Sequence, residues 1–244
     1  MDLVELLQQI DRKKAELDAK AIDDEKIEAY RSSYLSQAVF NSAALDGNAL
    51  TFEDVSTILE QNQVIPGKTM FDHLAVFGLF LARRLAEKMI KEQTKLSEYN
   101  LKLLHQTILF YKPAIAGNYR DFNMQVNDHR ATDFNKVPYK MTQLIDNLTQ
   151  SEGEHPVARA AFFHLRLEKV HPFGDGNGRL GRLASNIILA EAGYPQVVFP
   201  LPERQRYFDA ISAYEGLNGN PTKQPMELLL AETVDKQLDQ LLAL

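Results

Sequence analysis

The sequence predicts an all-α fold, a bundle of helices with a single short β-hairpin. Apolar residues recur at helical spacing through most of the 244 residues, which is typical of amphipathic helices. One stretch, residues 117–127, breaks this periodicity and is expected to form the hairpin. Hydrophobic residues make up 45% of the chain, an ordinary share for a globular protein, so we expect one compact unit.

Capping residues and apolar spacing place the helices along the chain. Thr51 is an expected N-cap, because the acid three residues later completes a capping box. Gly47 is the expected C′ residue, which directly follows the end of the helix at residues 28–46. Phe77, Leu81 and Leu85 are expected in the core. In chain order, helices are expected at residues 3–17, 28–46, one beginning at Thr51, 71–91, one beginning at Ser97, 137–148, 158–169, 179–192 and 226–242.

The charge balance argues against nucleic acid and membrane partners. The net charge is −6, so the protein as a whole is not attracted to anionic polymers or lipid surfaces. The chain contains no cysteine, which excludes disulfides and Cys-ligated metals. The N-terminus lacks a secretory apolar region, and no apolar run approaches membrane-spanning length. We therefore expect a soluble cytoplasmic protein.

The nonapeptide at residues 171–179, His-Pro-Phe-Gly-Asp-Gly-Asn-Gly-Arg, carries most of the chemistry. It lies between two expected helices and leads into a helix N-terminus, where free N–H groups and the helix dipole favour anions. Gly176, Asn177 and Gly178 can present a row of backbone N–H donors to phosphate groups. Asp175 is a hard oxygen ligand for Mg²⁺, and His171 is a candidate general base.

Two arginines follow in the first turn of the next helix. Arg179 and Arg182 stand three residues apart, so both guanidinium groups project to one side. Planar guanidinium groups there can bind phosphate oxygens bidentately. A histidine, a carboxylate, a glycine nest and two arginines at this spacing predict a site for a metal-bound polyphosphate beside a proton acceptor.

The loop resembles the signature of the Fic (Fido) family, His-Pro-Phe-x-Asp-Gly-Asn-Gly-Arg, at every defined position. The resemblance covers about residues 30–230 and implies a Fic-type helical bundle with a β-hairpin flap next to the active-site loop. It also implies a protein adenylyltransferase, which moves AMP from ATP, held with Mg²⁺, to a Ser, Thr or Tyr hydroxyl of a target protein. His171 then resembles the base, Asp175 the Mg²⁺ ligand, residues 176–178 the anion hole, and Arg179 and Arg182 the phosphate clamps.

Residues 42–47, Ser-Ala-Ala-Leu-Asp-Gly, are similar to an inhibitory helix end in which relatives usually carry Glu. The resemblance implies that Ser42 and Asp46 belong to this inhibitory motif, with the Asp46 carboxylate reaching Arg182. Aspartate is one methylene shorter than glutamate, which predicts a weaker or water-bridged pairing. A carboxylate in the last turn of a helix also interacts unfavourably with the helix dipole unless a cation pairs with it.

Two more segments resemble functional parts of the family. Asn118, Tyr119 and Arg120 are similar to the flap that docks the target segment through main-chain hydrogen bonds. Tyr207 stands where relatives contact the adenosine, and a tyrosine buried in the core is an equal alternative.

The resemblance also divides the chain by function. Residues 1–95 form an N-terminal helical region that carries the inhibitory helix at about 28–47. Residues 96–225 form the Fic core, with the flap at 117–127 and the catalytic loop at 171–179, and residues 226–244 form a C-terminal helix. Self-modification and a homodimer are left open.

Other functions remain as alternatives. A Fic-type enzyme could remove AMP or transfer another phosphate-containing group. A catalytically idle adaptor that binds peptides would have no use for His171 with both arginines. A metal hydrolase using His155, His164 and His171 lacks a His-Glu-x-x-His or comparable ligand cluster.

Overall fold

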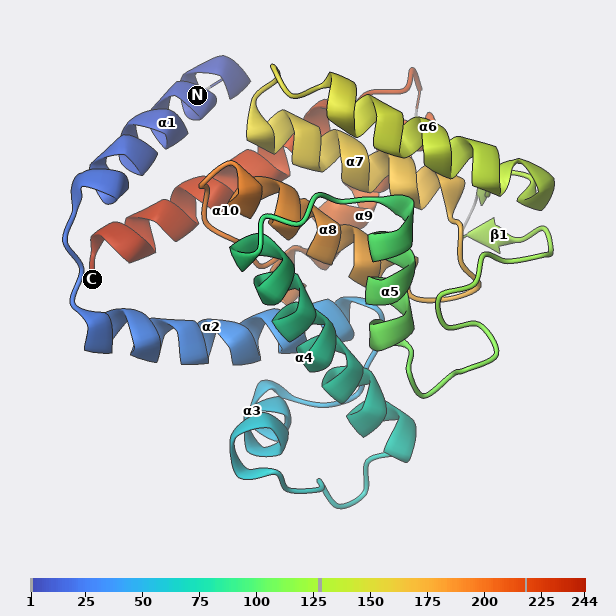
Figure 1. The fold of residues 1–244 in the computed structure, drawn as a ribbon, viewed down its shortest axis with the longest axis horizontal. Helices are drawn as coiled ribbons and strands as arrows, with labels where there is room; N and C mark the ends of the chain where they lie inside the picture. The colour runs from blue at the N-terminus through green and yellow to red at the C-terminus, as the bar shows by residue number, and fades with distance from the viewer. Residues whose placement is uncertain (1, 127–128, 218) are drawn as a thin grey trace.

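Within residues 2–126, 129–217 and 219–244, the computed structural model contains ten α-helices and one two-stranded antiparallel sheet (Figure 1). The prediction of an all-α fold is therefore confirmed. None of the helices in this part of the chain is long and apolar enough to cross a membrane. The helices are α1 (Leu3–Ala19), α2 (Asp24–Leu45), α3 (Phe52–Gln61), α4 (Met70–Lys91), α5 (Glu98–Ile108), α6 (Val137–Gln150), α7 (Pro156–Val170), α8 (Asn177–Glu191), α9 (Arg204–Glu215) and α10 (Gln224–Leu242). The strands are β1 (Gln125–Val126) and β2 (His129–Arg130), and single 3-10 turns lie at Phe134–Lys136 and Leu201–Glu203.

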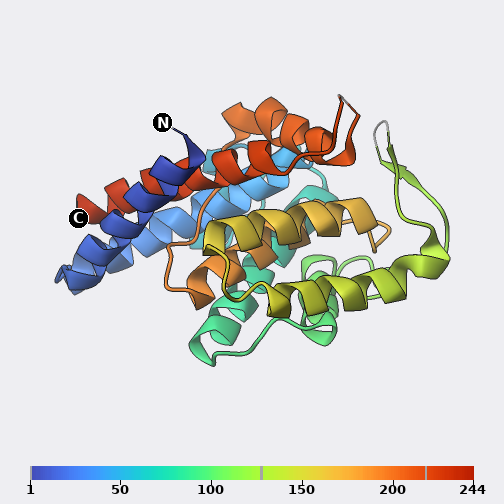
Figure 2. The same ribbon diagram turned by 90° about the horizontal axis from the view of Figure 1, so that it is seen from above.

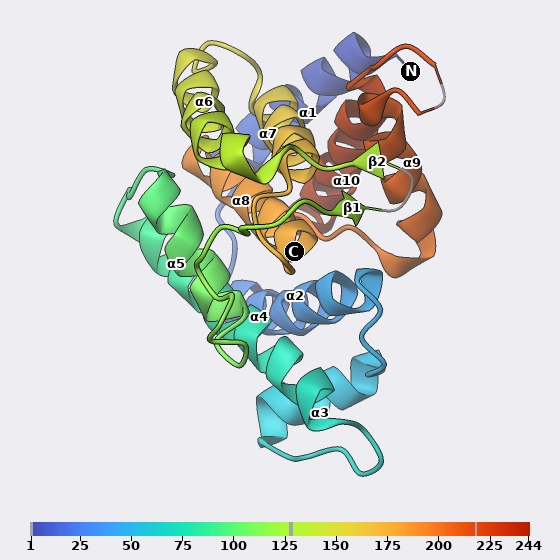
Figure 3. The ribbon, with the colours of Figure 1, turned by 90° about the vertical axis from the view of Figure 1, so that its right-hand side faces the viewer.

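Helix α8 forms the centre of the molecule. It is buried along most of its length, and α2, α4, α5 and α7 all contact it (Figure 3). Gly181 allows α7 to approach, because a Cβ at this position would lie 2.6 Å from Nδ1 of His164. Ser185 donates a hydrogen bond to the carbonyl of Ala160 at 3.2 Å across the same contact. On the outside, α1 packs along α10 (Figure 2).

Helices α2, α3 and α4 share a smaller core of their own. Its buried members are Val39, Ala43, Leu50, Val55, Val76 and Leu79. The next buried residue of α2, Leu45, belongs to the main core instead. The C-terminal end of α2 is therefore packed between both cores, which places Asp46 over α8.

Helix ends follow the capping residues in the sequence. The Thr51 hydroxyl accepts from the N–H of Asp54 at 3.2 Å, and the Asp54 carboxylate accepts from the N–H of Thr51 at 2.9 Å. This confirms the predicted capping box. Ser97 caps α5 with a single bond, its hydroxyl accepting from the N–H of Asn100 at 3.2 Å. Gly47 has φ of +89°, as a residue that terminates a helix in the left-handed region requires.

The hairpin lies further along the chain than predicted. Its strands are residues 125–126 and 129–130, with Gln125 opposite Arg130 and Val126 opposite residue 129. Asn127, the last residue of the predicted hairpin, lies outside the described residues. The break in helical periodicity at Gly117 marks a loop, and the strands begin eight residues later.

The predicted core face of α4 is only partly confirmed. Phe77 is 41% exposed, whereas Leu81 and Leu85 are partly buried and Leu85 packs against the main core. The helix instead buries Val76, Leu79, Ala82, Arg83, Ala86 and Met89. An apolar helix such as this one offers more than one plausible face, and packing against α8 and α2 selects between them.

Candidate active site

Residues 171–176 connect the two central helices. His171 ends α7 with φ of +47°, and Gly176 precedes α8 with φ of +77°. A left-handed histidine is sterically costly and persists only where its surroundings hold it. The buried side chain of Asn177 supplies one restraint: its amide donates to the carbonyl of Phe173 at 2.9 Å and accepts from the N–H of Phe173 at 3.0 Å. The loop is therefore closed on itself by the first residue of α8.

His105 of α5 ties the loop to the segment that leads to the hairpin. Its Nε2 donates to the carbonyl of Asp175 at 2.8 Å, and its Nδ1 accepts from the N–H of Gly117 at 2.9 Å. The ring stacks on Phe173, with centroids 3.7 Å apart. Burial lowers the pKa of His105 to about 4, so the ring is neutral and can serve as donor and acceptor at once. Sequence reasoning missed this residue, since nothing in its local pattern distinguishes it from any other helical histidine.

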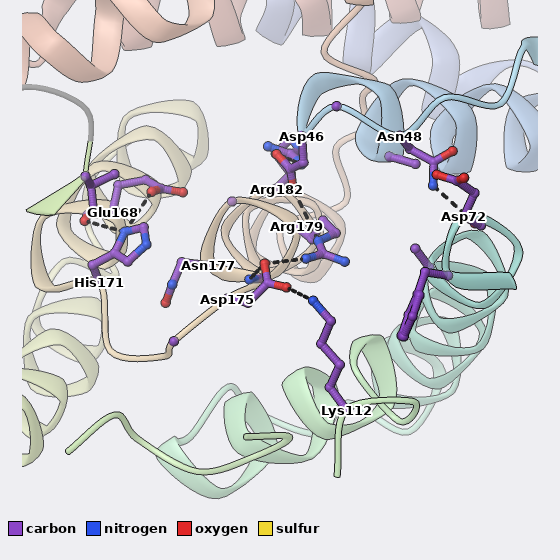
Figure 4. Close-up of a pocket in the computed structure, with 18 of the residues that line it drawn as sticks. Asp46, Asn48, Asp72, Lys112, Glu168, His171, Asp175, Asn177, Arg179 and Arg182 are labelled. Carbon is purple, nitrogen blue, oxygen red and sulfur yellow. Dashed lines mark hydrogen bonds and ion pairs between the residues drawn. The ribbon is translucent and has the colours of Figure 1, made fainter. Parts of the chain in front are cut away.

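A pocket of about 650 Å³ lies over the loop (Figure 4). The N-terminus of α8 forms its floor. Because the first N–H groups of a helix have no intrahelical acceptor, residues 177–179 present donors and the positive end of a helix dipole to this space. The predicted site residues that line it are Asp46, His171, Asp175, Gly176, Asn177, Gly178, Arg179, Arg182 and Tyr207.

Asp46 sits above this floor and contacts both arginines. Its carboxylate lies 3.0 Å from Nη2 of Arg182 and 3.2 Å from Nε of Arg179. The predicted contact with Arg182 is therefore direct, despite the shorter side chain, and the contact with Arg179 is an addition. Gly178 leaves room for the pair, because a Cβ there would lie 2.9 Å from Nη1 of Arg182.

Arg182 is the most enclosed cation of the site, with 4% exposure. It donates from Nε to the Ser42 hydroxyl at 3.1 Å, from Nη2 to the Ser42 carbonyl at 2.8 Å and from Nη1 to the Tyr207 hydroxyl at 3.1 Å. Burial by itself would lower the pKa of Arg182, but Asp46 and Tyr207 raise it above its usual value. Ser42 thus belongs to the arginine site, as the sequence motif predicts.

Asp175 faces the pocket beside the α8 N-terminus. Its carboxylate accepts from Lys112 Nζ at 2.7 Å, from Arg179 Nη2 at 2.7 Å and from the N–H of Gly176 at 2.6 Å. Burial alone would raise the pKa of Asp175, whereas Arg179 and Lys112 lower it, so it is an anion. Lys112, which follows α5, was not predicted.

A metal ion at this point would have few protein ligands. Among the described residues, no cluster of three or more His, Cys, Asp or Glu side chains could hold a metal. A single carboxylate completed by phosphate oxygens and water is the usual arrangement for Mg²⁺. Asp175, next to the α8 N-terminus, fits a Mg²⁺ ion that would arrive with a nucleotide.

His171 borders the pocket and turns Nδ1 back onto α7. Nδ1 lies 3.3 Å from the carbonyl oxygen of Glu168 and 3.4 Å from its Oε2 (Figure 4). With Nδ1 engaged in this way, Nε2 is the ring nitrogen left for a reaction in the pocket. Glu168 was not predicted, although its i,i+3 spacing from His171 is a signal that the sequence contains.

Tyr207 borders the pocket from the core. Its side chain is 1% exposed, and its hydroxyl lies 2.7 Å from Nε2 of His164 and accepts from Arg182. These contacts are those of a buried core tyrosine, and contact with an adenosine stays a prediction. His155, meanwhile, contacts Asp11 at 3.1 Å, so the three histidines of the metal-hydrolase hypothesis each have a different partner.

The predicted docking role of Arg120 is corrected. Arg120 is 5% exposed, and its guanidinium donates to the carbonyls of His171 at 2.7 Å, Phe122 at 2.7 Å and Val170 at 3.2 Å. It therefore supports the loop from behind. Tyr119 is partly buried and packs on Phe173, with centroids 5.3 Å apart, while Asn118 is exposed.

The sequence and the fold are similar to those of known proteins. Residues 95–189 match the model of the Fic/DOC family. The chain is 28% identical over 237 residues to protein adenylyltransferase Fic of Drosophila willistoni, covering 96% of this chain and 47% of that protein. It is 29% identical over 219 residues to the protein of the same name from Nematostella vectensis, covering 88% and 50%. A solved structure of Fic-1 from C. elegans superposes with a TM-score of 0.89 at 25% identity, covering 99% of this chain and 72% of that one. The chain spans about half the length of the curated relatives it matches.

Proposed function

From the Fic/DOC domain that this chain carries at residues 95–189, we propose that it transfers AMP from ATP to a hydroxyl group of a target protein. The observation that carries this proposal is a single pocket of about 650 Å³ that combines His171, the α8 N-terminus and two arginines. The curated relatives named protein adenylyltransferase Fic support it.

Each residue of the site has a separate role in this transfer. The N–H groups at the start of α8 bind the α- and β-phosphates, and Arg179 and Arg182 offset the charge on the phosphate chain. His171 takes the proton of the target hydroxyl through Nε2. The hydroxyl oxygen then bonds to the α-phosphorus as the bond from that phosphorus to pyrophosphate breaks. Asp175 would hold Mg²⁺, which when bound offsets phosphate charge.

We further infer that Asp46 inhibits this reaction. A guanidinium group that pairs with a carboxylate at 3.0 Å is not free to bind a phosphate oxygen, and the same carboxylate also occupies Arg179 at 3.2 Å. In this proposal residues 1–95 are a regulatory region, residues 96–225 the catalytic core and residues 226–244 a supporting helix.

The target segment would dock along the hairpin, within the predicted flap at residues 117–127 but not at residues 118–120. Val126 of β1 lines the pocket, whereas Arg120 is buried. We therefore propose β1 as the docking edge. Self-modification, a homodimer and a cytoplasmic location stay predictions.

The test uses ATP labelled at the α-phosphate, with Mg²⁺ and a cell lysate as the source of targets. The parent, Asp46→Gly and the double variant Asp46→Gly/His171→Ala are compared. We expect strong protein labelling by Asp46→Gly, weak labelling by the parent and none by the double variant. Label that comes only from the γ-phosphate, or labelling that survives the loss of His171, would contradict the proposal. Equal labelling by the parent and Asp46→Gly would contradict the inhibitory role alone.

A further inference from the structure

Glu168 is a buried acid in an unfavourable place. It is 7% exposed and lies in the last turn of α7, where a negative charge opposes the helix dipole. Burial by itself would raise the pKa of Glu168, but the contact with His171 and the positive charge of Arg182 lower it. The side chain is therefore an anion held in a nearly dry position.

Its contacts point to the catalytic histidine. Its Oε2 lies 3.4 Å from Nδ1 of His171. The other carboxylate oxygen, Oε1, is buried and has no hydrogen-bond partner in the part of the chain that the structure describes. Among the described residues, no other side chain therefore forms a hydrogen bond with the Glu168 carboxylate.

The backbone of His171 creates this contact. With φ of +47°, the residue folds back so that Nδ1 faces the turn that precedes it, where both acceptors of Glu168 lie at 3.3 and 3.4 Å. A histidine that continued α7 as helix would point elsewhere. On the opposite side, Nε of the Arg120 guanidinium donates to the His171 carbonyl at 2.7 Å, which helps to fix the turn.

We propose that the Glu168 carboxylate is a positioning residue for the general base. It holds the proton of the neutral ring on Nδ1, which leaves the Nε2 lone pair for the target hydroxyl. When Nε2 takes that proton, the ring gains one positive charge beside a carboxylate already in place. The reaction in which this matters rests on the proposed function, whereas the tautomer is a property of the resting protein.

The test compares Glu168→Gln with Glu215→Gln, each in the Asp46→Gly background. Glutamine keeps the shape of glutamate and removes its charge. Glu215 is a matched control, because its side chain is also buried, at 6% exposed. It pairs at 3.7 Å with Lys169, the residue that follows Glu168 in the chain. We expect Glu168→Gln to lower kcat about 10- to 100-fold without raising KM for ATP. Glu215→Gln should leave both unchanged.

A second measurement does not depend on activity. In ¹⁵N-labelled protein, the His171 ring signals, assigned by their loss in His171→Ala, should show the proton on Nδ1 and a strongly downfield proton resonance. Glu168→Gln should move that resonance upfield or lose it to solvent exchange, and Glu215→Gln should preserve it. A parent ring protonated on Nε2, or a Glu168→Gln protein with unchanged resonance and kcat, would overturn the inference. Expected ring signals without AMP transfer in any variant would instead overturn the proposed function and leave the positioning role standing.

Discussion

Replacing Asp46 with asparagine should make the protein less stable and more responsive to ATP. The carboxylate contacts Arg182 at 3.0 Å and Arg179 at 3.2 Å, and the side chains of both arginines are under 10% exposed, at 5% and 8%. Asparagine keeps the size of the side chain but removes the charge. Arg182 would keep only neutral partners, the Ser42 oxygens and the Tyr207 hydroxyl.

The size of the effect follows from these contacts. Hydrogen bonds to a charged group contribute about 1.5–3 kcal/mol each when solvent is excluded. The Asp46 side chain is 28% exposed, so water screens part of the interaction, and we expect a loss of about 2 kcal/mol for the two contacts together. For a chain of this length 1 kcal/mol corresponds to about 2–4 °C in Tm, so Tm should fall by about 4–8 °C.

Thermal unfolding with and without ATP tests both parts of this prediction. ATP phosphates can replace the missing negative charge at the two arginines, so ATP should raise the Tm of Asp46→Asn more than that of the parent. Glu87→Gln is the control, because Glu87 pairs with Arg84 at 3.2 Å on the surface, and its loss should cost no more than about 0.5 kcal/mol. A variant with the Tm and the ATP response of the parent would show that Asp46 does not compete with phosphate for the arginines.

Two further predictions concern the scaffold of the site. Gly181→Ala would place a Cβ 2.6 Å from Nδ1 of His164 and should lower the free energy of unfolding by about 1–3 kcal/mol in urea titrations. Gly153→Ala, with no atom within 4 Å of the new Cβ, should change it by less than about 0.5 kcal/mol, and equal midpoints for the two variants would contradict the close packing of α7 on α8. The free energy of unfolding should fall as pH drops from 6.5 to 4, because the unfolded chain protonates His105 near pH 6.5 while the folded protein resists until about 4. The loss is about 3 kcal/mol for this group, and His105→Asn should reduce the slope in urea titrations at several pH values; an unchanged slope would refute the assignment.

The site was predictable where one short segment contains both the residue and its geometry. Residues 171–182 form a loop and the first turns of a helix, so their relative positions follow from local structure. Asp46 could be assigned to Arg182 only through the resemblance of residues 42–47 to a known motif. No property of that segment alone indicates which distant arginine it meets.

Residues that act through tertiary contacts escaped prediction or were assigned the wrong role. His105 contacts Asp175 from α5, and Lys112 contacts it from the turn after α5. Both are so far from Asp175 in sequence that no helical or strand periodicity relates them to it. Arg120 is a charged residue in a loop, which predicts exposure. It is buried instead, because the fold brings together four backbone carbonyls that accept hydrogen bonds from its guanidinium. Phe77 shows the same limit for packing, since apolar spacing defines a set of faces and only neighbouring helices select one.

The neutral ring of His105 has a mechanical consequence for the whole pocket. Its hydrogen bonds to Asp175 and Gly117, at 2.8 and 2.9 Å, tie the loop before α8 and the segment that leads to the hairpin to α5. These segments together form one wall of the pocket. The opposite wall is the end of α2, and polar contacts from Ser42 and Asp46 hold it to α8. We expect access to this chamber to change by displacement of the α2 wall, while the α5 wall stays fixed as the reference against which substrates are aligned.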